Sequence, residues 1–248
     1  MNFRNKLGRI LGTGLGLIGA GAWGGLVGFG VGAIIDKLHQ EGLLLWDSSP
    51  SSEKTDPTDF ILSSLVLASA VIKSDGKIED LELSYVNTFL IDQFGKDNIH
   101  EYIDIMERAM KSKWDLRKVT QQIRQSTSYE TRLQLLYFLF GIANADFNID
   151  DKEIATIKII SIHLGLSAND HDSIKAMFYH EMDAYYKILE VRPSASDSAI
   201  KDAYHKMAIK YHPDKVEHLG EAVKSAAKEK FQKVQHAYDT IKSKRGFK

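Results

Sequence analysis

Apolar residues between positions 58 and 192 recur at the spacing of buried helix faces. Leu133, Leu136, Phe140 and Ala143, for example, fall on one stripe of a helix. The chain has four prolines and none falls within this stretch, so helices can continue without a proline break. No segment alternates apolar and polar residues in the manner of a half-buried strand. The pattern predicts an all-α region with helices near residues 58–73, 79–94, 98–112, 115–125, 128–145, 150–163 and 168–180.

A second helical region is predicted from Asp183 onward. A short helix is followed by an amphipathic helix that ends at His212, because Pro213 disfavours the helical conformation for the residue before it. A basic loop, residues 215–220, leads to a last amphipathic helix. The two longer helices carry facing apolar stripes, formed by Ile200, Tyr204, Met207, Ala208 and Tyr211 and by Ala227, Phe231, Val234, Tyr238 and Ile241. We therefore expect an antiparallel helical hairpin that holds the loop at its tip.

The N-terminal region has a different pattern. Residues 10–35 contain no charged residue, and ten of these 26 residues are glycine. As a helix this run would extend about 39 Å, enough to cross a hydrocarbon core of about 30 Å. It is therefore predicted to be a membrane segment, and glycines four residues apart, as at Gly8, Gly12 and Gly16, would let two copies pack as a homodimer. A flexible glycine tract is the alternative, because glycine disfavours helix formation.

Charge is unevenly distributed along a chain whose net charge is −1. Residues 183–248 contain 14 Lys and Arg against 9 Asp and Glu, whereas the preceding residues contain 18 against 24. A basic region can meet an acidic protein surface or nucleic acid, but its lysine-bearing helix has no arginine and no stacking aromatic outside the apolar stripe. We therefore expect no nucleic-acid partner. Cysteine is absent, which excludes thiolate chemistry, and no catalytic motif occurs in a fitting context, so an enzyme is not expected.

Two acidic segments, residues 75–83 and 146–154, align with each other at a separation of 71 residues. Each begins with an aspartate at a turn and places carboxylates at the start of the next helix. Carboxylates there cap free N–H groups and complement the helix dipole, which is a structural role. They would equally supply the oxygen ligands that a divalent cation such as Ca²⁺ or Mg²⁺ prefers. The candidate ligands are Asp75, Glu79, Glu82, Asp146, Asp150 and Glu153.

These acidic segments resemble an element of the TerB-like (tellurite-resistance B) all-helical domain, in which Asp-Gly-x-Ile-x-x-x-Glu occurs in each pseudo-symmetric half. The resemblance covers about residues 58–180 and implies a fold more than a function. Phe147 departs from the pattern, because it stands where the first copy has Gly76. This departure makes the second copy the weaker candidate for a ligand role.

The C-terminal region resembles the J-domain (DnaJ) family over residues 183 to about 243. The match joins an opening Tyr-Tyr-x-Ile-Leu, the run Ala-Tyr-x-x-x-Ala-x-x-Tyr-His-Pro-Asp, and a later Lys-Phe-x-x-Val-x-x-Ala-Tyr. The resemblance implies that His212, Pro213 and Asp214 engage a DnaK-type ATPase chaperone and trigger its ATP hydrolysis. It also implies a docking face formed by Lys201, Tyr204, His205, Lys206 and Lys210. Glu190 departs from the family, which usually has glycine there.

The order of segments is similar to that of DjlA-type membrane-anchored co-chaperones. The chain would comprise a membrane segment (1–46), a linker (47–57), a TerB-like domain (58–180) and a J-domain (183–248). The resemblance implies a co-chaperone at the inner membrane with both domains facing the cytoplasm; a cation-binding stress-response scaffold is the alternative. Positive residues precede the membrane segment, which places the N-terminus in the cytoplasm. Either the N-terminus crosses despite its charge, or the segment is re-entrant.

Overall fold

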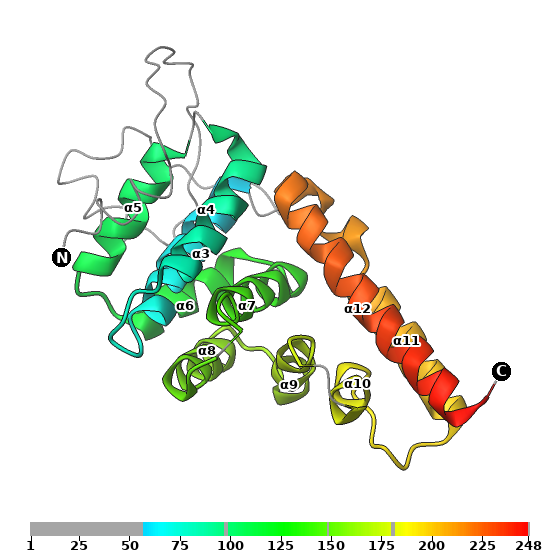
Figure 1. Cartoon of the computed structure of the whole chain (residues 1–248). Coiled ribbons are helices and arrows are strands. Elements are labelled where there is room, and N and C mark those ends of the chain that lie inside the picture. Colours follow the sequence, from blue (N-terminus) through cyan, green and yellow to red (C-terminus); the bar gives the residue numbers. More distant parts are fainter. Residues whose placement is uncertain (1–56, 97–98, 148, 180–181, 248) are drawn as a thin grey trace.

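The computed structural model describes residues 57–247 apart from 97–98, 148 and 180–181 (Figure 1). Within these ranges every regular element is a helix, which confirms the all-α prediction for this part of the chain. The glycine-rich segment, residues 1–46, and nearly all of the 47–57 linker lie outside the described residues. No helix of the described part combines the length and the hydropathy that a membrane crossing requires.

Seven helices form a bundle in the first part of the described chain, and their bounds agree with the predicted ranges to within a few residues. They are α3 (Pro57–Ile72), α4 (Asp80–Phe94), α5 (His100–Lys111), α6 (Leu116–Ser126), α7 (Tyr129–Ala143), α8 (Asp151–His163) and α9 (Ala168–Ala176). α7 is buried along nearly its whole length and packs against α3, α4, α8 and α9. It is therefore the central helix of the bundle. Its start is fixed by Ser128, whose hydroxyl accepts a hydrogen bond from the Thr131 N–H at 3.1 Å.

The C-terminal part forms the expected helical hairpin. Its elements are α10 (Met182–Ile188), α11 (Asp197–Lys210), the short 3₁₀ helices η2 (Pro213–Lys215) and η3 (Glu217–Leu219), and α12 (Glu221–Arg245). α11 and α12 close on each other through their buried stripes, and the Tyr204 ring stacks on Tyr238 with centroids 4.4 Å apart. Aromatic stacking and apolar burial thus hold the two long helices together.

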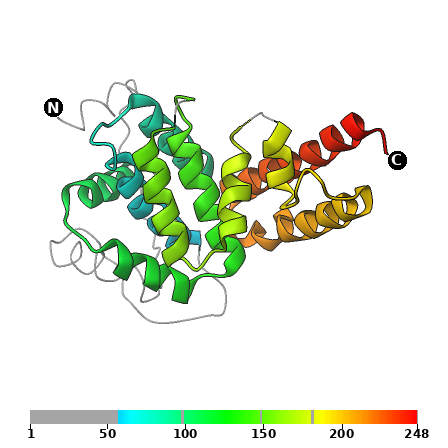
Figure 2. The same ribbon diagram turned by 90° about the horizontal axis from the view of Figure 1, so that it is seen from below.

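The hairpin extends away from the bundle in both views (Figures 1 and 2). The N-terminal part of α12 lies against α4 and α7, and α10 lies between α9 and α12. The loop between α11 and α12 is consequently at the end of the hairpin that is nearest to the bundle.

Candidate functional site

The tip of the hairpin presents His212, Pro213 and Asp214 on a short 3₁₀ turn, and we call these three residues the HPD tip. The His212 side chain is 49% exposed and the Asp214 side chain 75% exposed. The His212 ring caps the turn, because its Nδ1 accepts a hydrogen bond from the Asp214 N–H at 3.4 Å. It also stands edge-on to Phe231 of α12, with centroids 5.9 Å apart. The side chains of the tip are therefore accessible to a partner, and the backbone that carries them is held in place.

The predicted docking residues on α11 differ in their surroundings. His205 and Lys206 are exposed, whereas Lys201 and Tyr204 are half-buried. The Lys201 ammonium lies 5.9 Å from the Phe247 ring centroid. Sequence reasoning missed Ile209, which is 68% exposed between Lys206 and the HPD tip. Ile209 lies outside the apolar stripe of this helix, and this position could have predicted that its side chain is exposed.

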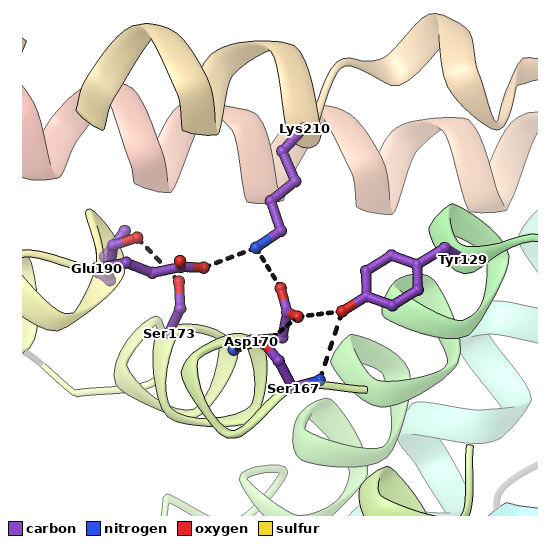
Figure 3. Close-up of polar contacts among 7 residues, drawn as sticks. Tyr129, Ser167, Asp170, Ser173, Glu190 and Lys210 are labelled. Carbon is purple, nitrogen blue, oxygen red and sulfur yellow. Dashed lines mark hydrogen bonds and ion pairs between the residues drawn. The ribbon is translucent and has the colours of Figure 1, made fainter. Parts of the chain in front are cut away.

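Lys210 points toward α9, where its ammonium meets Asp170 (Figure 3). Its side chain is only 20% exposed, and its ammonium lies between the carboxylates of Asp170 and Glu190. The distance to Glu190 Oε1 is 2.6 Å. The structure thus brings Lys210 into an ion-pair cluster between the hairpin and the bundle, whereas Lys206, one turn earlier on α11, is exposed.

Asp170 is the buried centre of this cluster. Its carboxylate pairs with Lys210 and accepts hydrogen bonds from the Tyr129 and Ser167 hydroxyls (Figure 3). Burial alone would raise the pKa of Asp170, but the hydrogen bonds from Lys210, Ser167 and Tyr129 outweigh it and lower the pKa. Burial likewise opposes the charge on Lys210, yet Tyr211 and the two carboxylates raise its pKa. Both groups are therefore charged at neutral pH.

A buried lysine lies close to the ion-pair cluster. Lys230 of α12 is almost completely buried, and its ammonium lies 4.7 Å from the Tyr211 ring centroid and 5.8 Å from that of Tyr137. Burial lowers the pKa of Lys230 to about 7. The neighbouring Lys233 covers the Phe178 ring at 4.4 Å, so α12 meets α7 and the end of α9 through cation–π contacts.

The two acidic elements converge at the starts of α4 and α8. The carboxyl groups of Glu82 and Glu153 are hydrogen-bonded to each other, and each also accepts the N–H at the start of its own helix. Burial raises the pKa of Glu82 to about 8 and also raises that of Glu153. Asp75 and Asp150 accept turn N–H groups at 2.8 Å. These contacts give the carboxyl groups the capping role that the sequence suggested.

The remaining predicted ligands stay near these turns. Glu79 is the N-cap of α4, and Asp146 precedes Phe147 in the second loop. Among the described residues no cluster of three or more His, Asp or Glu side chains has a geometry suited to a metal ion. Phe147 takes a left-handed φ of 63°, as Gly76 does at 86°, so the two turns share their backbone form.

Comparisons with known proteins agree with the two-part architecture. Residues 62–176 match the family model described as Tellurite resistance protein TerB, and residues 184–246 match the DnaJ domain. A protein of Haemophilus influenzae named Co-chaperone protein DjlA is 26% identical, covering 98% of this chain and 99% of that protein. The proteins of the same name from Photorhabdus laumondii and Escherichia coli K12 are 24% and 23% identical, each covering 97% of this chain and 98% of its own length. No solved structure matches the chain.

Proposed function

Because the chain combines a TerB domain with a DnaJ domain and is DjlA-like over nearly its whole length, we propose that it is a co-chaperone of a DnaK-type ATPase. The observation that carries this proposal is the exposed HPD tip at the end of a packed helical hairpin. The chain itself performs no chemistry in this role. It binds the chaperone and promotes the conformation in which the chaperone hydrolyses its own ATP.

The tip supplies two polar groups and one rigid element for this contact. The exposed Asp214 carboxylate is available to accept charge-assisted hydrogen bonds from cationic groups of the partner. Pro213 fixes the turn between His212 and Asp214, so little conformational entropy is lost on binding. The exposed His205 and Lys206 extend the contact along α11, where positive charge favours fast, salt-sensitive association with an acidic surface.

The proposal is tested by single-turnover ATP hydrolysis of the cognate chaperone in the presence of the full chain. We expect stimulation that is lost in His212→Gln, because the amide does not reproduce the imidazole ring, which stands edge-on to Phe231 and is half exposed to a partner. His100→Gln, at an exposed histidine of α5, is the matched control and should stimulate as the wild type does. Equal stimulation by the His212 variant and the wild type would remove the proposed role of the tip.

A membrane tether completes the proposed function. Residues 10–35 would hold the chain at the inner membrane, with the TerB-like and J-domains in the cytoplasm where ATP and the chaperone are available. The glycine spacing supports a homodimer through this segment. Fractionation of cells that express the chain with and without residues 1–36 tests the tether: only the longer chain should sediment with membranes.

The convergence of Glu82 and Glu153 supports a second candidate, a divalent cation at the acidic turns. Two buried carboxyl groups that share a proton could instead share a cation, with Asp75 and Asp150 nearby. Calorimetric titration of the full chain with Ca²⁺, Mg²⁺ and Zn²⁺ should then give heat that Glu82→Gln abolishes. Absence of heat with all three ions would leave the carboxyl groups with their capping role alone.

A further inference from the structure

The TerB-like domain contacts the hairpin on both sides of the HPD tip. Besides the contacts of Lys230 and Lys233 further along α12, polar contacts fall within residues 210–222, which we call the tip segment. Three polar side chains of the TerB-like domain make them, and each comes from a different helix: Gln93 from α4, Glu130 from α7 and Asp170 from α9. The His212 and Asp214 side chains stay exposed.

Asp170 holds the tip segment immediately before the tip. Its partner Lys210 lies in the last turn of α11, two residues from His212. Asp170 is itself fixed by the hydroxyl groups of Tyr129 and Ser167, so the carboxylate has little freedom to move (Figure 3). Ser173 of the same helix donates to the Ile188 carbonyl at 2.8 Å and ties α9 to α10. The start of the tip segment is thus anchored to a rigid part of the bundle.

Glu130 holds the tip segment directly after the tip. Its Oε1 lies 3.1 Å from the ammonium of Lys215, the residue that follows Asp214. Both side chains are about one-third exposed, so this contact is weaker than the buried one at Asp170. It restrains the η2 turn from the side that faces α7.

Gln93 holds the far end of the tip segment through two hydrogen bonds. Its side-chain amide donates to the Leu219 carbonyl and accepts from the Ala222 N–H, both at 3.0 Å. Gly220 is the N-cap of α12 and has no side chain to cap the helix, so Gln93 supplies the cap from another domain. Gly220 also makes the approach possible, because a Cβ there would lie 1.8 Å from Gln93 Nε2.

We propose that the TerB-like domain is a positioning frame for the HPD tip, with Gln93, Glu130 and Asp170 as its positioning residues. This inference rests on the proposed co-chaperone function. The frame holds the tip segment in one conformation before the chaperone arrives, which reduces the ordering required on binding. A J-domain without the frame would have to order this segment when it binds.

The test uses the full chain and the triple variant Gln93→Ala, Glu130→Gln, Asp170→Asn. Amide hydrogen exchange is followed at Lys215, Val216 and Leu219, whose N–H groups are hydrogen-bonded within the tip segment. Exchange at these amides should become about tenfold faster in the triple variant. Local opening of the tip segment costs less free energy there, because the three contacts no longer have to be broken. The chaperone concentration that gives half-maximal stimulation should rise about three- to tenfold, with the maximal rate within about twofold of wild type. Asp92→Asn and Asp172→Asn, exposed neighbours on α4 and α9, should change neither measurement.

The outcomes separate this inference from the proposed function. Stimulation by wild type with no change in the triple variant would overturn the positioning role, and so would faster exchange with an unchanged half-maximal concentration. A lower half-maximal concentration would also overturn it, because the TerB-like domain would then mask the tip instead of positioning it. No stimulation by wild type would instead refute the co-chaperone function itself. If the triple variant does not fold, Glu130→Gln alone tests the partly exposed contact and should give a smaller shift of the same sign.

Discussion

Replacing Lys230 with methionine should stabilise the protein, and the gain should depend on pH. Lys230 is almost fully buried beside the rings of Tyr137 and Tyr211. Lys210 further disfavours its charge, and Asp170 favours it. Methionine has a similar length and no charge, so it can fill the same space without a buried ammonium.

The magnitude follows from the pKa of Lys230, which falls from 10.5 to about 7 on folding. Below pH 7 the side chain is charged in both states, and the folded state carries the full desolvation penalty. Between these two pKa values the unfolded chain binds a proton that the folded chain does not, so the free energy of unfolding rises with pH. The pKa shift corresponds to a penalty of at most about 5 kcal/mol for the buried charge. Methionine also loses the cation–π contacts of Lys230, which reduces the gain by about 2 kcal/mol. We expect Lys230→Met to gain on the order of 3 kcal/mol at pH 6 and little at pH 10.5.

Thermal unfolding of the full chain, followed by circular dichroism, measures this effect. A gain of about 3 kcal/mol corresponds to a rise in Tm of roughly 6–12 °C for a chain of this size. Lys228→Met, at an exposed position on the same helix, is the control and should leave Tm nearly unchanged. A lower Tm for Lys230→Met at pH 6, or an equal gain at both pH values, would refute the assignment of a penalised buried charge.

Two further substitutions test other parts of the structure by thermal unfolding. Folding raises the pKa of Glu82 from 4.5 to about 8, so the stabilising contribution of Glu82 is lost as pH rises through that window. Glu82→Gln should therefore make Tm decline less steeply with pH. An unchanged dependence of Tm on pH would contradict a proton shared between Glu82 and Glu153. Gly220→Ala should lower stability by about 1–3 kcal/mol, because Gly220 has a φ of 104° and its Cβ would collide with Gln93. Gly246 also has a left-handed φ, but a Cβ there would meet no atom within 4 Å, so Gly246→Ala should lose less stability. Equal losses of stability in the two variants would argue against the Gln93 contact.

The helices could be predicted because the signals that determine them are local. Apolar spacing sets which face is buried, and residues such as Ser128, Asp150 and Ser196 cap the following helices through hydrogen bonds of a few residues' separation. α11 ends at Lys210, two residues before the end at His212 that Pro213 predicted. These interactions depend on neighbours in the sequence, so the sequence alone is nearly sufficient to predict where each helix lies.

The contact between the two domains could not be predicted in the same way. Gln93 meets a backbone that is 126 to 129 residues away along the chain. Gln93 and Glu130 belong to no motif, and the sequence around Asp170 predicts only its local capping contact with Ser167. Lys206 and Lys210 are one helical turn apart and chemically identical, yet only Lys206 is exposed. Which lysine is available to a partner depends on the neighbouring domain.

The two departures from glycine, at Glu190 and Phe147, show how a sequence comparison can mislead about geometry. Both residues keep a left-handed backbone, with φ of 56° and 63°, although side chains disfavour that region. At Glu190 this conformation directs the carboxylate to Lys210, and the ion pair offsets the backbone strain, which is of order 1 kcal/mol. Glu190 is therefore one of the two residues, with Asp170, whose carboxylates hold the Lys210 ammonium. The left-handed backbone just after α10 and the placement of a lysine side chain 20 residues later are thus linked by one ion pair.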